Sequence, residues 1–283
     1  MPSRNDTKSK KMNQLGIGII GTGRVGRALA VNLARAGWRI SGVNDLDSER
    51  SSETARIVPT GSFDDVRKLV RRSDILFLTV PDSEIARLAE SLGEIEKFRA
   101  RFVFHVSGIL PAKVLQLAGL DRAVYSLHPF GGIPENSNGV NPFCGLYFSG
   151  EGDDAAKPIA RDITSSLGGE FIPMDAQEKV LYHLAASLVA NHIFALFSSG
   201  EELLEKAGIS HENVKPMVIE MARKALENYT EKGLVEGLTG PVTRGDELTI
   251  AEHIIAAEHV GRRELYEAGL VELRKILGLK IDE

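Results

Sequence analysis

Short apolar runs alternate with helical patterns along residues 15–174 of this 283-residue chain. The first run, LGIGII, is followed by a glycine-rich turn and a stretch, residues 25–36, whose apolar positions recur at helical spacing. A strand–helix–strand rhythm of this kind packs as a mostly parallel sheet with helices on both faces, so the sequence predicts a doubly wound α/β domain. The later apolar runs cover residues 38–43, 74–80, 101–106, 123–127, 145–150 and 168–174.

The pattern becomes helical after Met174 and stays so. Asp175, with Glu178 three residues later, has the spacing of a helix start in which the aspartate caps and the glutamate reaches back. Residues 177–206 then form one long helical pattern that is apolar on much of its circumference, so we expect it to be buried between neighbours. We expect three parts, namely a mobile tail at 1–14, an α/β domain at 15–174 and an all-α domain at 175–283. Further helices are predicted at 214–232, 250–259 and 263–277.

Composition excludes several classes of partner. The net charge is −5 with both signs interspersed, and the absence of a basic stripe argues against nucleic acid and against acidic membrane surfaces. Polar residues interrupt each apolar stretch, so we expect no membrane span, and the polar first fourteen residues do not read as a secretory signal. The single cysteine, Cys144, cannot form an internal disulfide, which fits a reducing cytoplasm. These features favour a cytoplasmic globular protein.

The strongest functional signal is the turn GTGRVG, which follows the first predicted strand and opens the first predicted helix. Its glycines suit a tight turn, close approach of the backbone to a pyrophosphate, and close helix–strand packing, in that order. Asp45 ends the next predicted strand, about 20 residues beyond the motif, where an acid binds the adenosine ribose. This context favours a nicotinamide dinucleotide site over a glycine turn in another α/β fold. Its predicted contacts are Gly21, Thr22, Gly23, Arg24, Val25, Gly26 and Asp45.

The residues around Asp45 bear on the choice between NAD and NADP. Its carboxylate would repel a 2′-phosphate, and Leu46 follows where a basic residue would often receive one, so the sequence favours NAD. Arg24 and Arg50 lie close enough in sequence to leave NADP open.

Another predicted strand ends at Val80, Pro81 and Asp82, at the sheet edge where ligands bind in open α/β folds. These residues border the cofactor in one interpretation. In the other, Pro81 only ends the strand and Asp82 only caps the following helix.

Two further strand ends carry polar side chains that could act on a substrate. Ser107 follows one strand in HVSG, and His128 follows the next in SLHPF, so both face the cofactor edge. Histidine is suited to proton exchange near neutral pH. The alternative for His128 is a histidine held by backbone hydrogen bonds. His105, within its strand, is predicted to be a satisfied core histidine.

The long helix opens with a polar stripe. Lys179 and His183 are four residues apart and share a face, which Ser187 and Asn191 continue. Polar groups on an apolar, buried helix are costly unless they have partners, which argues for a functional role. Lys179 could protonate a developing alkoxide or hold a carboxylate. Alternatively, it points to water from the first turn.

The loop LTGPVTRGDELT joins two predicted helices and contains Arg244 and Asp246. An arginine on a rigid loop is suited to bind a carboxylate through two parallel hydrogen bonds. We therefore predict that Asn191, Arg244 and Asp246 bind the substrate. The alternative is an ordinary interhelical turn in which Asp246 caps a helix.

These motifs together resemble the oxidoreductase family that pairs a Rossmann-like domain with a C-terminal domain of unknown function of the DUF2520 type. The resemblance extends from Leu15 to the last helices and rests on GTGRVG, VPDSEI, HVSG, SLHPF, KVLYHLAASLVAN and LTGPVTRGD. It implies a place beside ketopantoate reductases, 3-hydroxyisobutyrate-type dehydrogenases and 6-phosphogluconate dehydrogenases. In those relatives a helix lysine and an asparagine four residues later line the substrate site. Here Lys179 matches the lysine, and His183 stands in place of the asparagine.

Ser107 and His128 also resemble the serine and the histidine of the HP motif in prephenate dehydrogenases. The sequence thus predicts hydride transfer between a nicotinamide and a small anionic 2-oxo or hydroxy acid, with ketopantoate as a specific example. Lys179, His183 and His128 would handle the proton, and the apolar helices would form a homodimer. Alternatives are a prephenate-like dehydrogenase, an imine reductase, or a dinucleotide sensor without catalysis.

Overall fold

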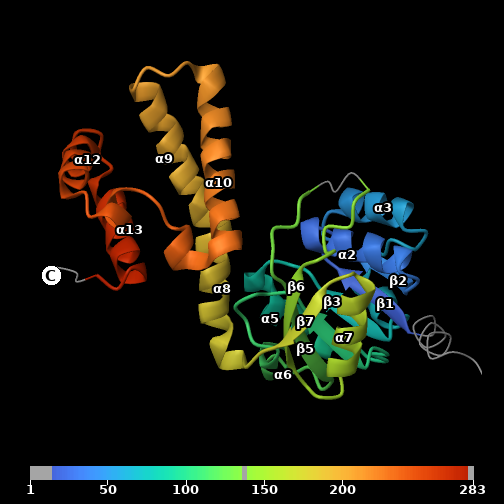
Figure 1. The fold of residues 1–283 in the computed structure, drawn as a ribbon. Helices are drawn as coiled ribbons and strands as arrows, with labels where there is room; N and C mark the ends of the chain where they lie inside the picture. Colours follow the sequence, from blue (N-terminus) through green and yellow to red (C-terminus); the bar gives the residue numbers. More distant parts are fainter. Residues whose placement is uncertain (1–14, 136–138, 280–283) are drawn as a thin grey trace, which may run out of the picture. The chain divides into compact units, whose positions relative to one another are not determined.

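The computed structural model describes residues 15–135 and 139–279, so the predicted tail at 1–14 lies outside the described residues. These described residues form two compact units, divided between Ala190 and Asn191. Figure 1 shows a sheet with flanking helices in the first unit and helices alone in the second.

A seven-stranded sheet forms the centre of the first unit, in the order β2-β1-β3-β4-β5-β6-β7. Strands β1 to β5 are parallel, whereas β6 runs antiparallel to β5 and β7 runs parallel to β6. The predicted α/β class is therefore confirmed, with two reversed strands at one edge. The strands are β1 Gly16–Ile20, β2 Arg39–Asn44, β3 Ile75–Leu78, β4 Phe102–His105, β5 Ala123–Pro129, β6 Tyr147–Gly152 and β7 Glu170–Pro173.

Helices cover both faces of this sheet because its strands are apolar on both sides. One core joins Phe104 and Tyr125 to helices α2 and α7, and the other joins Val103 and Val124 to α4, α5 and α6. Alternate residues of β4 and β5 therefore point to opposite faces. The helices are α2 Arg24–Arg35, α3 Ser48–Ile57, α4 Val66–Val70, α5 Asp82–Gly93, α6 Lys113–Leu117 and α7 Lys157–Ser166.

The boundary between the units lies later than the sequence predicts. The predicted division followed Met174, but the first unit continues to Ala190 and includes α8, Lys179–Ser187, after a short 3-10 turn at Ala176–Glu178. The reason is that Lys179 is bonded into the sheet. A change from alternating to helical pattern marks where helices begin, but it does not show which unit they pack against.

The second unit is a set of helices with a small core of its own. It contains α9 Ile193–Lys206, α10 His211–Gly237, α11 Pro241–Arg244, α12 Glu247–His259 and α13 Arg263–Ile276. Helix α10 is interrupted at Gly233, whose φ of 75° is left-handed. The core cluster of this unit comprises Val242, Ile250 and Leu270.

The long helical pattern at 177–206 differs from expectation in two respects. A π-helix, Leu188–His192, divides it into α8 and α9, and many of its apolar side chains are exposed within this single chain, including those of Leu184 and Phe194. By length and composition alone, the run Ala176–Lys206 could also cross a membrane, contrary to the sequence-based expectation. Its first turns are nevertheless fixed to the sheet by Lys179.

Candidate functional site

The glycine turn after β1 has the geometry that the sequence predicts. Gly21 has a φ of 94°, and a side chain there would lie 2.7 Å from the carbonyl oxygen of Thr79. A side chain at Gly26 would lie 1.9 Å from the carbonyl oxygen of Gly21, so helix α2 packs directly on the turn. At Gly23, by contrast, no described atom lies within 4 Å of the added carbon. The turn is therefore closed behind Gly21 and Gly26 and open in front of Gly23.

The first turn of α2 leaves its backbone donors available. Gly23 is the N-cap residue and provides no side-chain cap, and Arg24 and Val25 begin the helix. Free N–H groups and the helix dipole attract an anion at such a terminus. A surface hollow of about 370 Å³ adjoins it, lined in part by Thr22, Gly23, Arg24 and Arg50. The arrangement fits the pyrophosphate of a dinucleotide.

Asp45 holds the glycine turn in place. Its carboxylate accepts hydrogen bonds from the Thr22 backbone N–H at 2.5 Å and the Thr22 hydroxyl at 2.9 Å, and from the Asp47 N–H at 3.0 Å. The acid thus lies beside the turn, as the motif requires, while Leu46 is fully exposed. Its contacts also give Asp45 a structural role that the sequence did not predict.

The nearby arginines are largely paired. Arg27 lies 3.4 Å from Glu53, and Arg50 lies 3.8 Å from Asp47. Within the described ranges, Arg24 has no ion pair with an acidic side chain. The charge near the turn is therefore mixed.

The end of β3 meets the same turn. The Thr79 hydroxyl donates to the Gly21 carbonyl at 2.5 Å. Val80 and Pro81 follow, and Asp82 begins α5 and accepts a hydrogen bond from the Ser107 hydroxyl at 2.7 Å. Asp82 therefore links two strand ends in addition to opening a helix.

Two imidazoles converge over Gly108. A side chain at Gly108 would lie 2.5 Å from His183 Nδ1 and 2.9 Å from His128 Nε2. The two rings stand edge to face, with centroids 5.8 Å apart. His128 comes from β5 and His183 from α8, and both lie at the carboxyl edge of the parallel strands. The sequence did not predict that His128 and His183 would meet, and their meeting requires glycine at 108.

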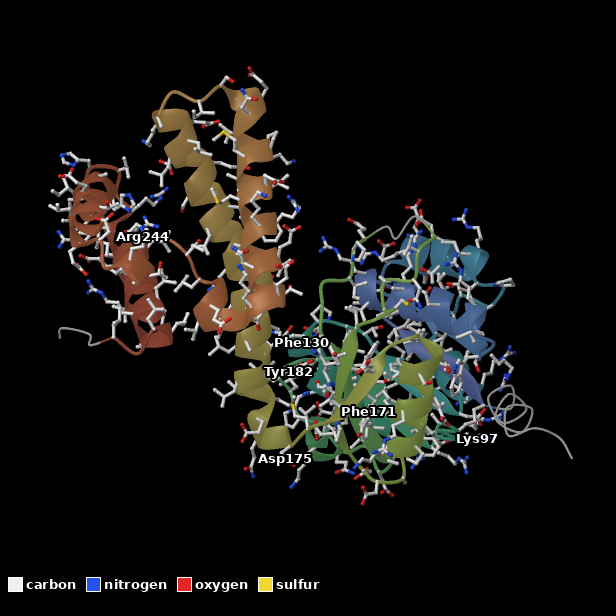
Figure 2. The ribbon with its side chains drawn as sticks, viewed as in Figure 1. Lys97, Phe130, Phe171, Asp175, Tyr182 and Arg244 are labelled. Atoms are coloured by element: carbon white, nitrogen blue, oxygen red, sulfur yellow. The ribbon has the colours of Figure 1, made fainter. Side chains whose placement is uncertain are left out.

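Tyr182 orients His128 and was missed by the sequence analysis. Its hydroxyl lies 3.1 Å from His128 Nδ1, and its ring packs on Phe130 with centroids 4.8 Å apart. Figure 2 shows Tyr182 and Phe130 facing each other between α8 and the sheet. A hydroxyl that donates to Nδ1 would leave the proton on Nε2, the nitrogen nearest Gly108. The position of Tyr182 directly before His183 in the sequence is the signal that could have identified it as a site residue.

Lys179 lies beneath this pair and not at the surface. Its side chain is 1% exposed, and Nζ donates to the Ser107 carbonyl at 3.1 Å and to the Ser126 hydroxyl at 2.7 Å. The alternative in which Lys179 points to water is therefore wrong. Its ammonium adds positive charge below the two imidazoles.

Burial and this charge keep His128 and His105 neutral. Desolvation, assisted by Lys179, lowers the pKa of His128 to about 3 and that of His105 to about 4. Burial also lowers the pKa of Lys179 itself, while the charges of Glu151 and Asp82 act in the opposite direction. At pH 7, His128 can therefore donate a hydrogen bond from a neutral ring without carrying charge.

His105 is a core residue, as expected, but only one of its ring nitrogens has a partner. Nδ1 accepts the Ser107 N–H at 3.2 Å, and Nε2 has no hydrogen-bond partner among the described residues. The prediction of a satisfied histidine is therefore half correct.

The three predicted substrate-binding residues belong to the second unit. Asn191 lies in the π-helix, whose wider turn interrupts the i, i+4 stripe after Ser187. Arg244 is exposed at the end of α11 (Figure 2). Asp246 caps α12, accepting bonds from the Thr249 N–H and hydroxyl, as the structural alternative predicted. The substrate-binding roles stay predictions.

The glycine turn provides a matched test. Gly26→Ala should lower stability and abolish cofactor binding, because the new methyl group would collide with the Gly21 carbonyl. Gly23→Ala should leave the apo protein folded with an unchanged melting temperature, yet weaken binding because the methyl would occupy the open side. Calorimetry of both variants with and without NADH checks this. Equal loss of apo stability in both would contradict the geometry described.

Comparison with protein families gives two matches. Residues 1–129 match the Rossmann-like domain, and residues 146–270 match the domain of unknown function DUF2520. A comparison with curated proteins finds no match.

Solved structures share the fold. A proposed NADP oxidoreductase from Bacteroides fragilis is 24% identical, with a TM-score of 0.73 over 92% of this chain and 98% of the other. A Thermotoga maritima protein is 22% identical, with a TM-score of 0.77 over 93% and 99%. A 1-pyrroline-5-carboxylate reductase from Streptococcus pyogenes is 16% identical, with a TM-score of 0.64 over 94% and 99%. The chain thus resembles a Rossmann-like domain over residues 1–129 and a DUF2520 domain over residues 146–270, as the motifs in its sequence suggested.

Proposed function

We propose that the protein is an NAD(P)-dependent oxidoreductase that reduces, reversibly, a small 2-oxo acid to a hydroxy acid. The observation that carries this proposal is the pairing of two features at one sheet edge. The glycine turn leaves an anion-binding helix terminus open there, and His128 and His183 converge over Gly108. Ligands in open α/β folds bind at this edge.

The residues that would hold the cofactor are those of the glycine turn, with Asp45 beside it and Val80 to Asp82 along the edge. When bound, a nicotinamide supplies a hydride. The similarity to solved oxidoreductase folds supports this class of cofactor.

His128 and His183 are the groups nearest to where a substrate oxygen would sit. Neutral His128 can donate a hydrogen bond from Nε2 and so polarise a carbonyl without repelling the Lys179 charge. His183 is exposed and lies beside His128 at the same edge. Negative charge that develops on the substrate oxygen would be stabilised by the buried ammonium of Lys179 below.

The buried position of Lys179 modifies the role that its sequence pattern suggested. Because its Nζ is bonded to Ser107 and Ser126, it supports the loop and the charge of the site in this structure. Direct proton transfer from Lys179 would need it to leave those bonds. We assign binding of the substrate carboxylate to Asn191 and Arg244 of the second unit, with Asp246 fixing the loop of Arg244.

An imine is the second candidate substrate. The shared fold with a pyrroline-5-carboxylate reductase supports an imine substrate. The neutral donor His128 argues against it, because such a donor suits a carbonyl oxygen better than a basic imine nitrogen. The presence of Ser107 and His128 supports a prephenate-like dehydrogenase as a further alternative function. A sensor without catalysis would have no need for two imidazoles converging on one glycine.

Lys179→Ala should reduce turnover by about 10²-fold or more while changing cofactor affinity little, because the lysine acts on charge that develops in the reaction. Keto acids, ketopantoate among them, and imines would first be screened with NADH and NADPH by absorbance loss. His183→Ala should show a similar loss, and the double variant should be no worse than the worse single one if both residues act on the same developing charge. Near-normal turnover of Lys179→Ala would transfer the main role to His128.

We propose that NADH binds more tightly than NADPH. Asp45 places negative charge beside the turn, and Leu46 offers no cation to a 2′-phosphate. Fluorescence titration of both cofactors tests this. A tenfold preference for NADPH, equivalent to about 1.4 kcal/mol, would show that Arg24 or Arg50 governs the choice.

We also propose that the protein is a homodimer formed through its second unit. Apolar side chains on α9 and α10 are exposed, among them Phe194 at 68%, Met221 at 73% and Leu226 at 64%. Large exposed apolar side chains gathered on two packed helices are typical of an interface. A second copy would bury the same helices by symmetry.

Met221→Glu should convert the dimer to a monomer in sedimentation experiments, because a carboxylate would be buried in the interface. Ile57→Glu, at an exposed apolar position on α3 of the first unit, should leave the dimer intact. A wild-type monomer at micromolar concentration would contradict the proposal.

A further inference from the structure

Three polar residues form one row across the sheet. His105 pairs with Ser126 between β4 and β5, and Ser126 pairs with Glu151 between β5 and β6. Directly paired residues share a face, with Cβ atoms about 4.5–5.5 Å apart in an antiparallel pair. Lys179 donates to the middle member, Ser126. Glu151 therefore lies on the same face as the oxygen that Lys179 contacts and directly beside it.

Lys179 lacks a direct ion pair. Its Nζ contacts the Ser107 carbonyl and the Ser126 hydroxyl, both uncharged, and no carboxylate of the described residues lies within 4 Å. Burying a cation in this way is costly without nearby negative charge. The nearby side chains of His105, His128 and His183 supply no negative charge.

Two carboxylates on neighbouring elements, Glu151 on β6 and Asp82 on α5, oppose through their charge the lowering of the Lys179 pKa by burial. Asp82 already accepts the Ser107 hydroxyl and is exposed. Glu151 is partly buried and has the larger effect on the pKa of Lys179. Of the two, Glu151 is the better placed to balance the charge.

The surroundings of Glu151 suit a retained negative charge. Its Oε1 accepts the Ala112 N–H at 2.6 Å. It also lines a hollow of about 520 Å³ open to solvent, together with Tyr125, Lys157 and Asp175. Burial raises the pKa of Glu151, but the Ala112 N–H and the Lys179 charge oppose that rise. The ionised form of the carboxylate is thus favoured by a backbone donor and by a nearby cation.

We propose that Glu151 is a positioning residue that keeps Lys179 protonated from the adjacent strand and so fixes the positive charge beneath His128 and His183. This proposal deepens the proposed reduction and rests on it for its catalytic consequence. The electrostatic pair itself is independent of any substrate.

The pair has a defined pH window. The Glu151–Lys179 attraction stabilises the fold when Glu151 is ionised and Lys179 protonated, and it is lost as the pH rises through the folded pKa of Lys179, which lies below 10.5. Removing the Glu151 charge lowers that pKa further. In Glu151→Gln, the pH at which turnover falls on the alkaline side should therefore be lower by about one unit or more.

The test is a double-variant cycle on stability. Glu151→Gln removes the charge but keeps an oxygen that can accept the Ala112 N–H. At pH 7 it should lower the melting temperature by about 2–4 °C in the wild-type background. In the Lys179→Met background the loss should be less than half as large. Glu170→Gln, at an exposed position on β7, is the matched control and should cause no loss.

The outcomes separate this inference from the proposed reduction. Equal losses in both backgrounds, or a loss from Glu151→Gln that persists at pH 10.5, would overturn the pairing of Glu151 with Lys179. A coupled loss would support it even if no keto acid or imine is turned over. An active enzyme whose alkaline limb is unmoved by Glu151→Gln would overturn the role of Glu151 and leave the reduction standing.

Discussion

The arrangement of the site in the first unit depends on one buried cation, the ammonium of Lys179, which is bonded to the sheet. The Lys179 ammonium bonds to the carbonyl of Ser107 after β4 and to the hydroxyl of Ser126 in β5. These two bonds fix the start of α8 against the sheet, and they thereby bring Tyr182 and His183 to the carboxyl edge. A cation without hydration would be unfavourable there unless these oxygens and nearby carboxylates compensated it. The geometry of the imidazole pair thus follows from where one lysine is held.

Two glycines give the same edge its two binding surfaces. Gly26 allows α2 to approach the glycine turn, which presents free N–H groups to an anion. Gly108 leaves the space in which His128 and His183 meet. Thr79 and Asp82 connect these regions through hydrogen bonds to Gly21 and to Ser107. The absence of side chains at two positions is therefore as important as the presence of the polar groups around them.

The sequence predicted the strands, the glycine turn and the position of His128 at the carboxyl edge of the sheet, because each depends on local pattern or on the common edge of parallel strands. It did not predict that His183 would meet His128, because the two residues come from different elements. It did not predict Glu151 or Ser126, because their neighbours are set by strand pairing across long sequence separations. It also placed Lys179 in the wrong unit, since helical periodicity does not reveal which surface a helix packs on. The sequence also gave no sign of the π-helix in which Asn191 lies, because its wider turn does not follow the ordinary helical spacing.

The charges at the edge limit what the first unit can do alone. His128 is neutral near pH 7, and the Lys179 charge is buried behind Ser107, so neither offers direct contact to a carboxylate. Helix α2 presents donors to the cofactor and not to a substrate. An anionic substrate therefore needs a cation from elsewhere, and exposed Arg244 of the second unit has the planar group suited to it.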